Sequence, residues 1–394
     1  MRREKIPVAV LSGYLGSGKT TLLNRLLANR NNLKMAVIVN DMSEVNIDAS
    51  LVKQGGFAKT DEKLVEMQNG CICCTLREDL LIEVEKLASL GDIDYIVIES
   101  SGISEPISVA QTFTYVDEIV GIDLSQFCRL DTMVAVLDAN RFWHDYASGE
   151  SLLDRKQAID DLDKREIADL LIDQIEFANV ILLNKSDLVS KSKLCELKAV
   201  LQKLNPDAKL IESEYAQVPL NQILNTGLFD FETSSQSAGW LKELNKEHVP
   251  ETGEYGMASF IYRIHKPFHP VRWMKWIEAW PVEVVRAKGF VWLATRKDIT
   301  GLLSQAGPSL TIQAIGKWIA TYPEAEQKQI LEEDRELLTR WHPVYGERMT
   351  ELVMIGIEMD QKQIEKELDA CLLTDREMTK DWSKSIDLFP VFTI

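Results

Sequence analysis

The stretch IPVAVLSGYLGSGKT, residues 6–20, decides the fold of this chain. A run of Val, Ala and Leu is followed by the glycine pattern GYLGSGKT and then by TLLNRLLAN, whose leucines recur at helical spacing. A buried strand, a glycine-rich loop and an amphipathic helix in this order are the structural context of a P-loop. The N–H groups of such a loop hold phosphate oxygens at the start of the helix.

Within this loop, Lys19 can supply a positive charge to the β- and γ-phosphates, and the Thr20 hydroxyl can ligate Mg²⁺. The alternative is a plain glycine-rich turn, and the flanking strand and helix argue against it. We therefore predict a phosphate-binding set made of Gly13, Gly16, Ser17, Gly18, Lys19, Thr20 and Thr21.

Further apolar runs predict the fold around the loop. They lie at residues 35–41, 95–100, 132–139, 179–185 and 208–213, with helical patterns between them. Near-continuous Val, Ile and Leu runs are typical of strands buried on both faces of a parallel sheet. Residues 1–230 are therefore predicted to form a doubly wound α/β P-loop domain with a mostly parallel sheet.

The pattern changes in the last third of the chain. Residues 231–256 are rich in Ser, Thr, Gly and Glu, which predicts a loop or linker that contains one helical turn. Residues 257–394 combine longer strands, such as 257–265 and 351–359, with helical stretches at 270–280, 323–341 and 361–373. This predicts a second, smaller α+β domain.

Composition excludes several classes of protein. The net charge of −17 in 394 residues argues against a general binder of nucleic acid or anionic membranes. No run approaches the roughly 18 apolar residues of a membrane helix, and no targeting segment is visible at the start. Six cysteines in a chain of this length do not resemble a secreted disulfide framework. We expect a cytoplasmic protein with reduced thiols.

The tetrapeptide NKSD indicates which base is bound. Asn184, Lys185 and Asp187 end a predicted strand at the edge of the sheet where ligands bind. The Asp187 carboxylate can accept two N–H bonds from the guanine edge, which adenine cannot offer. Alone, this tetrapeptide is a weak signal, but downstream of a P-loop it predicts GTP as the nucleotide.

Two other strand ends are candidates for catalysis. In YIVIESSGISEP, residues 95–106, Glu99 can organise Mg²⁺ or the attacking water, and Gly102 can offer its N–H to the γ-phosphate. With Lys19, these form the predicted catalytic set. Asp41 and Glu44 follow the second strand, where either a nucleotide-sensing loop or a solvated surface loop is expected.

Three of the six cysteines, Cys71, Cys73 and Cys74, fall within four positions in NGCICCTLRED, residues 69–79. Three soft ligands suit Zn²⁺, Cu⁺ or another thiophilic ion. A redox-active cluster and three small core side chains are the alternatives. Because zinc prefers four ligands, an incomplete set suits metal transfer better than a closed structural site. Cys128, Cys195 and Cys371 are isolated and are interpreted as core or incidental residues.

The P-loop, GCICC (70–74), ESSGISEP (99–106) and NKSDL (184–188), in this order, resemble the CobW-like family of P-loop GTPases. The second domain is also similar to the family's C-terminal domain in KPFHPVRWMKWIE (266–278), VVRAKGFVWLA (284–294) and SQAG (304–307). DANRFWHDYASGESLLDRKQ (138–157) resembles a subgroup linked to bacterial zinc limitation. One feature departs from many relatives, because the interdomain segment keeps only His248 of a histidine-rich stretch.

This resemblance implies a GTPase that binds zinc at the cysteine motif and delivers it to a client protein. It implies phosphate and Mg²⁺ binding by residues 16–20, guanine binding by the NKSD residues, and Glu44 as a possible fourth zinc ligand. The alternatives are a GTP-dependent metal sensor or regulatory interaction protein, and a chaperone for another metal such as cobalt or iron. The sequence does not identify the client or the oligomeric state.

Overall fold

The computed structural model describes residues 4–28, 33–41, 63–68, 77–114, 121–158, 163–245, 256–382 and 385–389. The chain divides into two compact units, Met1–Gly239 and Trp240–Ile394. The boundary lies inside the segment predicted as a linker. That segment is more ordered than expected, because it contains the short helices α8 (Phe231–Ser235) and α9 (Gly239–Asn245).

The first unit is built on a seven-stranded sheet with the strand order β3-β2-β4-β1-β5-β6-β7, in which every pairing is parallel. A doubly wound α/β fold was therefore correctly predicted. The strands are β1 (Ile6–Ser12), β2 (Met35–Asp41), β3 (Lys63–Gln68), β4 (Tyr95–Glu99), β5 (Cys128–Asp138), β6 (Val180–Asn184) and β7 (Lys209–Glu212).

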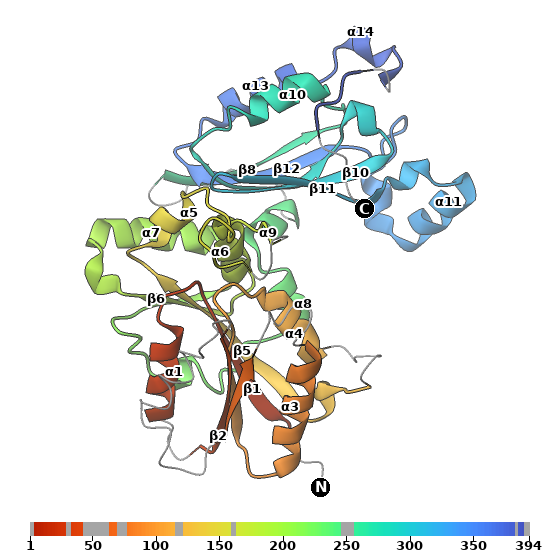
Figure 1. Cartoon of the computed structure of the whole chain (residues 1–394). Helices are drawn as coiled ribbons and strands as arrows, with labels where there is room; N and C mark the ends of the chain where they lie inside the picture. Colours follow the sequence, from red (N-terminus) through yellow and green to blue (C-terminus); the bar gives the residue numbers. More distant parts are fainter. Residues whose placement is uncertain are drawn as a thin grey trace. The chain divides into compact units, whose positions relative to one another are not determined.

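Helices cover both faces of this sheet, with α1 on one side and α3 and α4 on the other (Figure 1). Alternate strand residues face the two layers: Val8 and Val10 of β1 pack with α3 and α4, whereas Ala9 and Leu11 pack with α1. The helices of this unit, besides α8, are α1 (Lys19–Ala28), α3 (Arg77–Leu90), α4 (Pro106–Thr114), α5 (Phe142–Tyr146), α6 (Ile167–Glu176) and α7 (Lys191–Leu204). Burial on both faces explains the continuous apolar runs.

The second unit contains a five-stranded antiparallel sheet in the order β11-β10-β9-β12-β8. Helices α10 and α13 pack on one face, where Trp273 and Leu368 join the core (Figure 1). The elements are β8 (Met257–Ile264), α10 (Pro270–Ile277), β9 (Val284–Val291), β10 (Ile299–Ala306), β11 (Ser309–Lys317), α11 (Glu324–Glu333), α12 (Arg335–Arg340), β12 (Thr350–Ile357), α13 (Gln361–Cys371) and α14 (Asp375–Met378).

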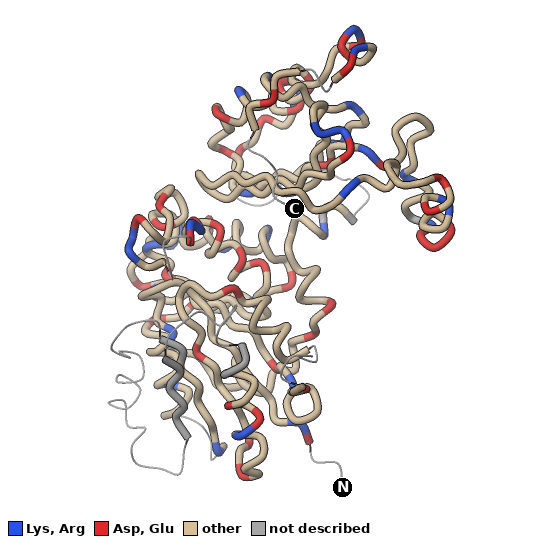
Figure 2. The backbone as a smooth tube through the Cα atoms, turned by 45° about the vertical axis from the view of Figure 1, so that its right-hand side comes forward, with Lys and Arg blue, Asp and Glu red and all other residues tan. Residues whose placement is uncertain are grey.

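Charged residues are spread along the described backbone of both units (Figure 2). Asp and Glu outnumber Lys and Arg by 61 to 44, so the chain as a whole is negatively charged. In the part of the chain that the structure describes, no helix combines the length and the apolar character needed to cross a membrane.

Candidate functional site

The glycine loop between β1 and α1 turns back on itself in a way that requires glycine. Gly13, Gly16 and Gly18 have φ values of 138°, 78° and 111°. A Cβ atom at Gly13 would lie 2.2 Å from the Val136 carbonyl oxygen, and one at Gly18 would lie 2.3 Å from Nδ2 of Asn184. The loop therefore packs against β5 and β6 through positions where no side chain fits.

Lys19 lies inside this loop. Its Nζ donates hydrogen bonds to the carbonyl oxygens of Gly13 (2.8 Å) and Tyr14 (3.5 Å), and the residue is 6% exposed. Ser17 is buried as well, whereas Thr21 is exposed on the first turn of α1. The ammonium group is thus held at the helix N-terminus, where a P-loop binds phosphate oxygens.

The next hydroxyl contacts the predicted catalytic carboxylate. Thr20 Oγ1 donates a hydrogen bond to Oε1 of Glu99 at 2.8 Å, and Glu99 is 1% exposed at the end of β4. Carboxylate and hydroxyl oxygens are the hard ligands that Mg²⁺ prefers, usually together with water and phosphate oxygens. This pair fits the predicted Mg²⁺ position beside Lys19, and the assignment stays a prediction.

Replacing Glu99 by Gln keeps the hydrogen bond from Thr20 but removes the negative charge. We expect GTP turnover to fall by about 10²-fold, and the Mg²⁺ concentration needed for half-maximal rate to rise, because the charge organises the ion or the attacking water. The measurement is a Mg²⁺ titration of the hydrolysis rate. Glu105→Gln, a charge loss farther along the same loop, is the control; equal rates for both variants would remove Glu99 from the catalytic set.

Gly102 follows Glu99 and lies against the P-loop. A Cβ atom here would lie 2.8 Å from the Leu15 side chain and 2.9 Å from its backbone nitrogen. The Gly102 carbonyl accepts from Gln174 Nε2 (3.3 Å), and the neighbouring Ile103 carbonyl accepts from Arg165 (3.1 Å). This geometry places the Gly102 backbone next to the loop that would hold the phosphates, as its predicted role requires.

Asn184 and Lys185 of the NKSD sequence contact the P-loop, whereas Asp187 is exposed. Asn184 donates from Nδ2 to the Ser17 carbonyl (2.9 Å) and accepts at Oδ1 from the Ala216 N–H (2.8 Å). Lys185, with φ of 58°, donates to the Gly16 carbonyl at 2.9 Å. Both side chains therefore brace the P-loop. Asp187 is exposed, and its carboxylate has no hydrogen bond or ion pair to any other residue that the structure describes.

Two groups beside the NKSD residues were not predicted from the sequence. Asp138, at the end of β5, forms an ion pair with Lys185 at 2.6 Å. The segment after β7 brings the Ala216 N–H to Asn184, and Tyr215 and Ala216 both have positive φ, 50° and 56°. Asp138 could have been found as a carboxylate near the end of the strand predicted at 132–139, but the sequence of residues 213–216 does not predict their backbone conformation.

A cluster around Arg155 was also missed, because 141 residues separate it from the P-loop. The Arg155 guanidinium donates to the Tyr14 hydroxyl (3.2 Å) and is anchored by Asp145 (2.8 Å) and Glu150 (2.7 Å). Tyr14 in turn donates to Gln157 Oε1 at 2.5 Å. Burial raises the pKa of Tyr14. Residues 138–157, singled out in the sequence, thus contact the P-loop directly.

The predicted zinc ligands lie outside the described residues. These are Cys71, Cys73, Cys74 and Glu44, and the same holds for the Asp41 side chain. Their flanks are described: β3 ends at Gln68 and α3 begins at Arg77. Because β3 is parallel to β4, it ends at the same sheet edge as Glu99. Among described residues, no group of three or more His, Cys, Asp or Glu could hold a metal ion.

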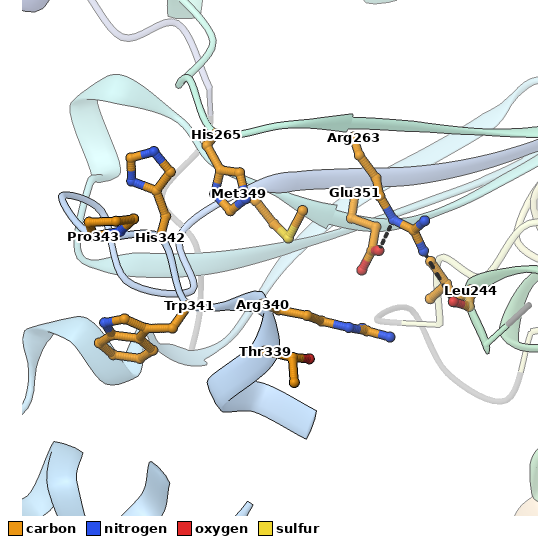
Figure 3. A pocket seen from close by; sticks show the side chains of 10 residues that line it. All are labelled: Leu244, Arg263, His265, Thr339, Arg340, Trp341, His342, Pro343, Met349 and Glu351. Carbon is orange, nitrogen blue, oxygen red and sulfur yellow. Dashed lines mark hydrogen bonds and ion pairs between the residues drawn. The ribbon is translucent and has the colours of Figure 1, made fainter. Parts of the chain in front are cut away.

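The isolated cysteines and three of the histidines make structural contacts. Cys128 is buried, and burial raises the pKa of its thiol to about 12, so it stays protonated. Cys371 is buried and Cys195 is half-buried. His269 caps α10 by accepting the Val271 N–H at Nδ1 (3.2 Å), and Pro270 begins the helix. The rings of His265 and His342 lie in the second unit with their centroids 5.0 Å apart and their planes tilted by 32° (Figure 3).

Comparison with known proteins matches both units. Residues 7–212 match the family model "CobW/HypB/UreG, nucleotide-binding domain", and residues 257–372 match "Cobalamin synthesis protein cobW C-terminal domain". The chain is 49% identical to the Dictyostelium discoideum protein named zinc-regulated GTPase metalloprotein activator 1, over 98% of this chain and 84% of that one. It is 27% identical to a Pseudomonas aeruginosa protein named zinc chaperone CobW, over 93% and 92% of the two chains. Among solved structures, the Zn(II)-bound YjiA GTPase from E. coli aligns with 94% of this chain and 99% of its own, at 18% identity and a TM-score of 0.40.

Proposed function

Because this chain belongs to the CobW/HypB/UreG family of P-loop GTPases, we propose that its GTPase cycle inserts zinc into client metalloproteins. The observation that carries the proposal is the constellation of the P-loop, Thr20–Glu99 and the NKSD residues at one sheet edge, to which the strand before the cysteine motif also leads. The names of two relatives, a zinc-regulated GTPase metalloprotein activator and a zinc chaperone, support zinc as the metal.

In this proposal the nucleotide cofactor is GTP, with its phosphates on the P-loop and its guanine on Asp187. Lys19 would stabilise the charge that develops on the phosphates. Mg²⁺ would be held by Thr20 with Glu99 nearby, and its charge would offset that of the transferred phosphoryl group. Residues 1–230 would carry this chemistry, and residues 257–394 would serve as the partner-binding domain.

In this proposal zinc is the cargo, bound by Cys71, Cys73 and Cys74 with Glu44 as the fourth ligand. Only eight residues, 69–76, lie between the end of β3 and the start of α3. A change at the γ-phosphate that shifts the loop after β4 therefore has a short path to the thiols. Such coupling is reciprocal: if GTP changes the affinity for zinc, zinc changes the affinity for GTP by the same factor.

The test is the dissociation constant of Zn²⁺ for the full chain, measured by competition with a chromogenic chelator in GDP and in a GTP analogue. We expect the two constants to differ by about 5- to 100-fold, the usual range of allosteric coupling. Equal constants would rule out nucleotide-controlled zinc binding. Repeating the titration with Co²⁺ and Fe²⁺ separates a zinc chaperone from a chaperone for another metal.

A second measurement separates delivery from sensing. An apo-client, such as a zinc enzyme stripped of its metal, is mixed with the zinc-loaded protein and GTP. Client activity that appears with GTP hydrolysis supports a metal-inserting GTPase. Partner binding without metal transfer would favour a regulatory sensor instead.

A further inference from the structure

The backbone of the loop after β4 is oriented by hydrogen bonds on successive peptide groups. The Ser101 carbonyl accepts from the N–H of Ser104 at 3.2 Å and from its hydroxyl at 2.9 Å. A trans peptide group is planar, so the N–H of Gly102 points away from the Ser101 carbonyl in the same plane. Fixing this carbonyl therefore fixes the direction of the N–H that is predicted to meet the γ-phosphate.

The next two peptide groups are held from outside the loop, by α6 and the residues before it. Gln174 Nε2 donates to the Gly102 carbonyl at 3.3 Å, and Arg165 Nη1 donates to the Ile103 carbonyl at 3.1 Å. Two bonds of 2.8 Å join the Arg165 guanidinium to both carboxylate oxygens of Asp163. Three consecutive carbonyls thus have donors, and rotation of any of these peptide groups breaks at least one hydrogen bond.

Helix α6 is also attached to the P-loop. Its first residue, Ile167, donates from its N–H to the Glu150 carbonyl at 3.2 Å. The Glu150 carboxylate forms an ion pair with Arg155 at 2.7 Å, and the Arg155 guanidinium donates to the Tyr14 hydroxyl at 3.2 Å. One connected set of contacts therefore holds both the loop after β4 and the loop that would bind the phosphates.

Stability alone does not explain why an amide is buried at position 174. Gln174 is 0% exposed and lies among the buried apolar side chains of α6. Because a carbonyl can only accept, the amide nitrogen faces Gly102 and Oε1 is directed elsewhere. Oε1 has no hydrogen-bond partner among the residues that the structure describes. An unpaired buried acceptor costs at least as much as one neutral hydrogen bond contributes, so this amide gives the fold no net gain in stability.

We propose that Gln174 is a positioning residue for GTP hydrolysis. Position 102 needs a glycine, because a Cβ atom there would lie 2.8 Å from the Leu15 side chain. Glycine has more backbone freedom than any other residue, so the orientation of Gly102 has to come from external hydrogen bonds. Gln174 supplies one of them from a buried helix position. A donor that is oriented in advance needs no reorganisation when charge develops on the phosphate.

The inference rests on the proposed role of the Gly102 N–H at the γ-phosphate, but not on zinc or on a client. Its experiments omit both, so their failure would leave the zinc titration unaffected. Equal zinc affinities in GDP and in a GTP analogue would in turn leave the role of Gln174 unaffected.

The test is the single-turnover rate of GTP hydrolysis at saturating GTP, measured together with the affinity for GDP. Gln174→Met keeps the length of the side chain and removes the donor. We expect the rate to fall about 10-fold and the affinity for GDP to stay within 2-fold, because GDP has no γ-phosphate for the Gly102 N–H to meet.

Gln202→Met is the matched control. Gln202 is exposed on α7 and donates to the Pro206 carbonyl at 2.7 Å, so the variant loses the same kind of hydrogen bond outside the nucleotide site. Its hydrolysis rate and its affinity for GDP should equal those of the wild type.

Gln174→Glu separates the donor from the shape of the side chain. Burial raises the pKa of a carboxyl group, so at low pH the introduced group is protonated and can donate to the Gly102 carbonyl. Once ionised, it has no proton to donate and repels that carbonyl. We expect its rate, divided by the wild-type rate at the same pH, to be near one at about pH 6 and to fall about 10-fold by about pH 9. The same ratio for Gln174→Met should not change with pH.

The proposal is overturned by a wild-type rate in Gln174→Met, or by an equal loss of hydrolysis and of GDP affinity in that variant. A rate ratio for Gln174→Glu that does not depend on pH would also overturn it. Melting temperatures of both variants complete the test. Loss of the folded state in both would make Gln174 a residue of the core rather than a positioning residue.

Discussion

Asp187→Asn is expected to change the nucleotide that this protein uses from GTP to xanthosine triphosphate. The carboxylate accepts two N–H bonds from guanine in the proposed site, and hydrogen bonds to charged groups contribute about 1.5–3 kcal/mol each. The asparagine also directs an N–H donor at one of those guanine donors, which leaves it unpaired. Xanthine replaces that donor with a carbonyl oxygen, which the asparagine amide can bind.

We expect the affinity for GTP to fall by about 10²- to 10⁴-fold and that for xanthosine triphosphate to exceed it, as the loss of two charged hydrogen bonds requires. The effect of this substitution can be assigned to nucleotide binding, because the exposed Asp187 carboxylate makes no hydrogen bond or ion pair with any other described residue. The measurement is competition of the two nucleotides, and of ATP, for a fluorescent analogue.

Glu196→Gln on α7 is the matched control for this substitution, because it makes the same change of carboxylate to amide outside the proposed site. It should leave the order of nucleotide affinities unchanged. A preference for GTP that persists in Asp187→Asn would show that another group reads the base. The matching substitution at Asn184 would be harder to interpret, since its amide bonds both Ser17 and Ala216.

The fold of the first unit was predictable because its central strands are buried on both faces. All five residues of β4 are buried, and so are all five of β6. The edge strand β3 was missed because KLVEMQ contains Lys63 and Glu66 and has no continuous apolar run. An edge position tolerates charges, and charged edges also discourage pairing with other chains.

The second unit was harder to predict, for two physical reasons. The hairpin of β10 and β11 was missed because β11 is an edge strand that alternates half-buried and exposed residues, and Gly307 makes its turn. Residues 323–341 were predicted as one helix but form α11 and α12. The break is at Asp334, whose side chain accepts the Leu337 N–H and caps the second helix.

The candidate site was predictable where a local motif carries the chemistry. Lys19, Thr20 and Asn184 lie in short patterns with defined spacing, and the structure brings them together. Arg155 was not predictable, because its contact with Tyr14 depends on how a segment 141 residues away packs against the P-loop. Sequence patterns identify residues that act through their neighbours in the chain, but tertiary contacts between distant segments leave no such pattern.

Replacing Cys71, Cys73 and Cys74 by Ser together is expected to abolish tight zinc binding. Zinc in proteins is bound by thiolates, and a serine hydroxyl neither ionises near neutral pH nor offers a soft donor atom. We expect the dissociation constant for Zn²⁺ to rise by at least about 10³-fold, since cysteine zinc sites contribute roughly 10–16 kcal/mol. In the absence of zinc, affinity for GTP should stay within 2-fold, because the P-loop contacts described above involve none of the three.

Cys195→Ser is the matched control, because it removes a half-buried thiol from α7 without touching the motif. Its zinc affinity should equal that of the wild type. Cys128 is less suitable as a control, since a serine hydroxyl at this buried position would need a hydrogen-bond partner inside the apolar core. Glu44→Gln tests the fourth ligand: a rise of about 10-fold in the dissociation constant is expected if the carboxylate completes the shell.

The triple variant also separates the metal interpretation of this motif from a redox one. The titration is run in a reductant that does not bind zinc, and the thiols of the wild type are counted before and after the metal is added. Protection of three thiols by one zinc ion, lost in the triple variant, is the expected result. Unchanged zinc affinity in the triple variant would place the metal elsewhere. A disulfide that forms in the wild type with the same midpoint redox potential in both nucleotide states would make the cluster a redox site. Because Cys128 and Cys371 are buried with raised pKa values, the protected thiols can be assigned to the motif.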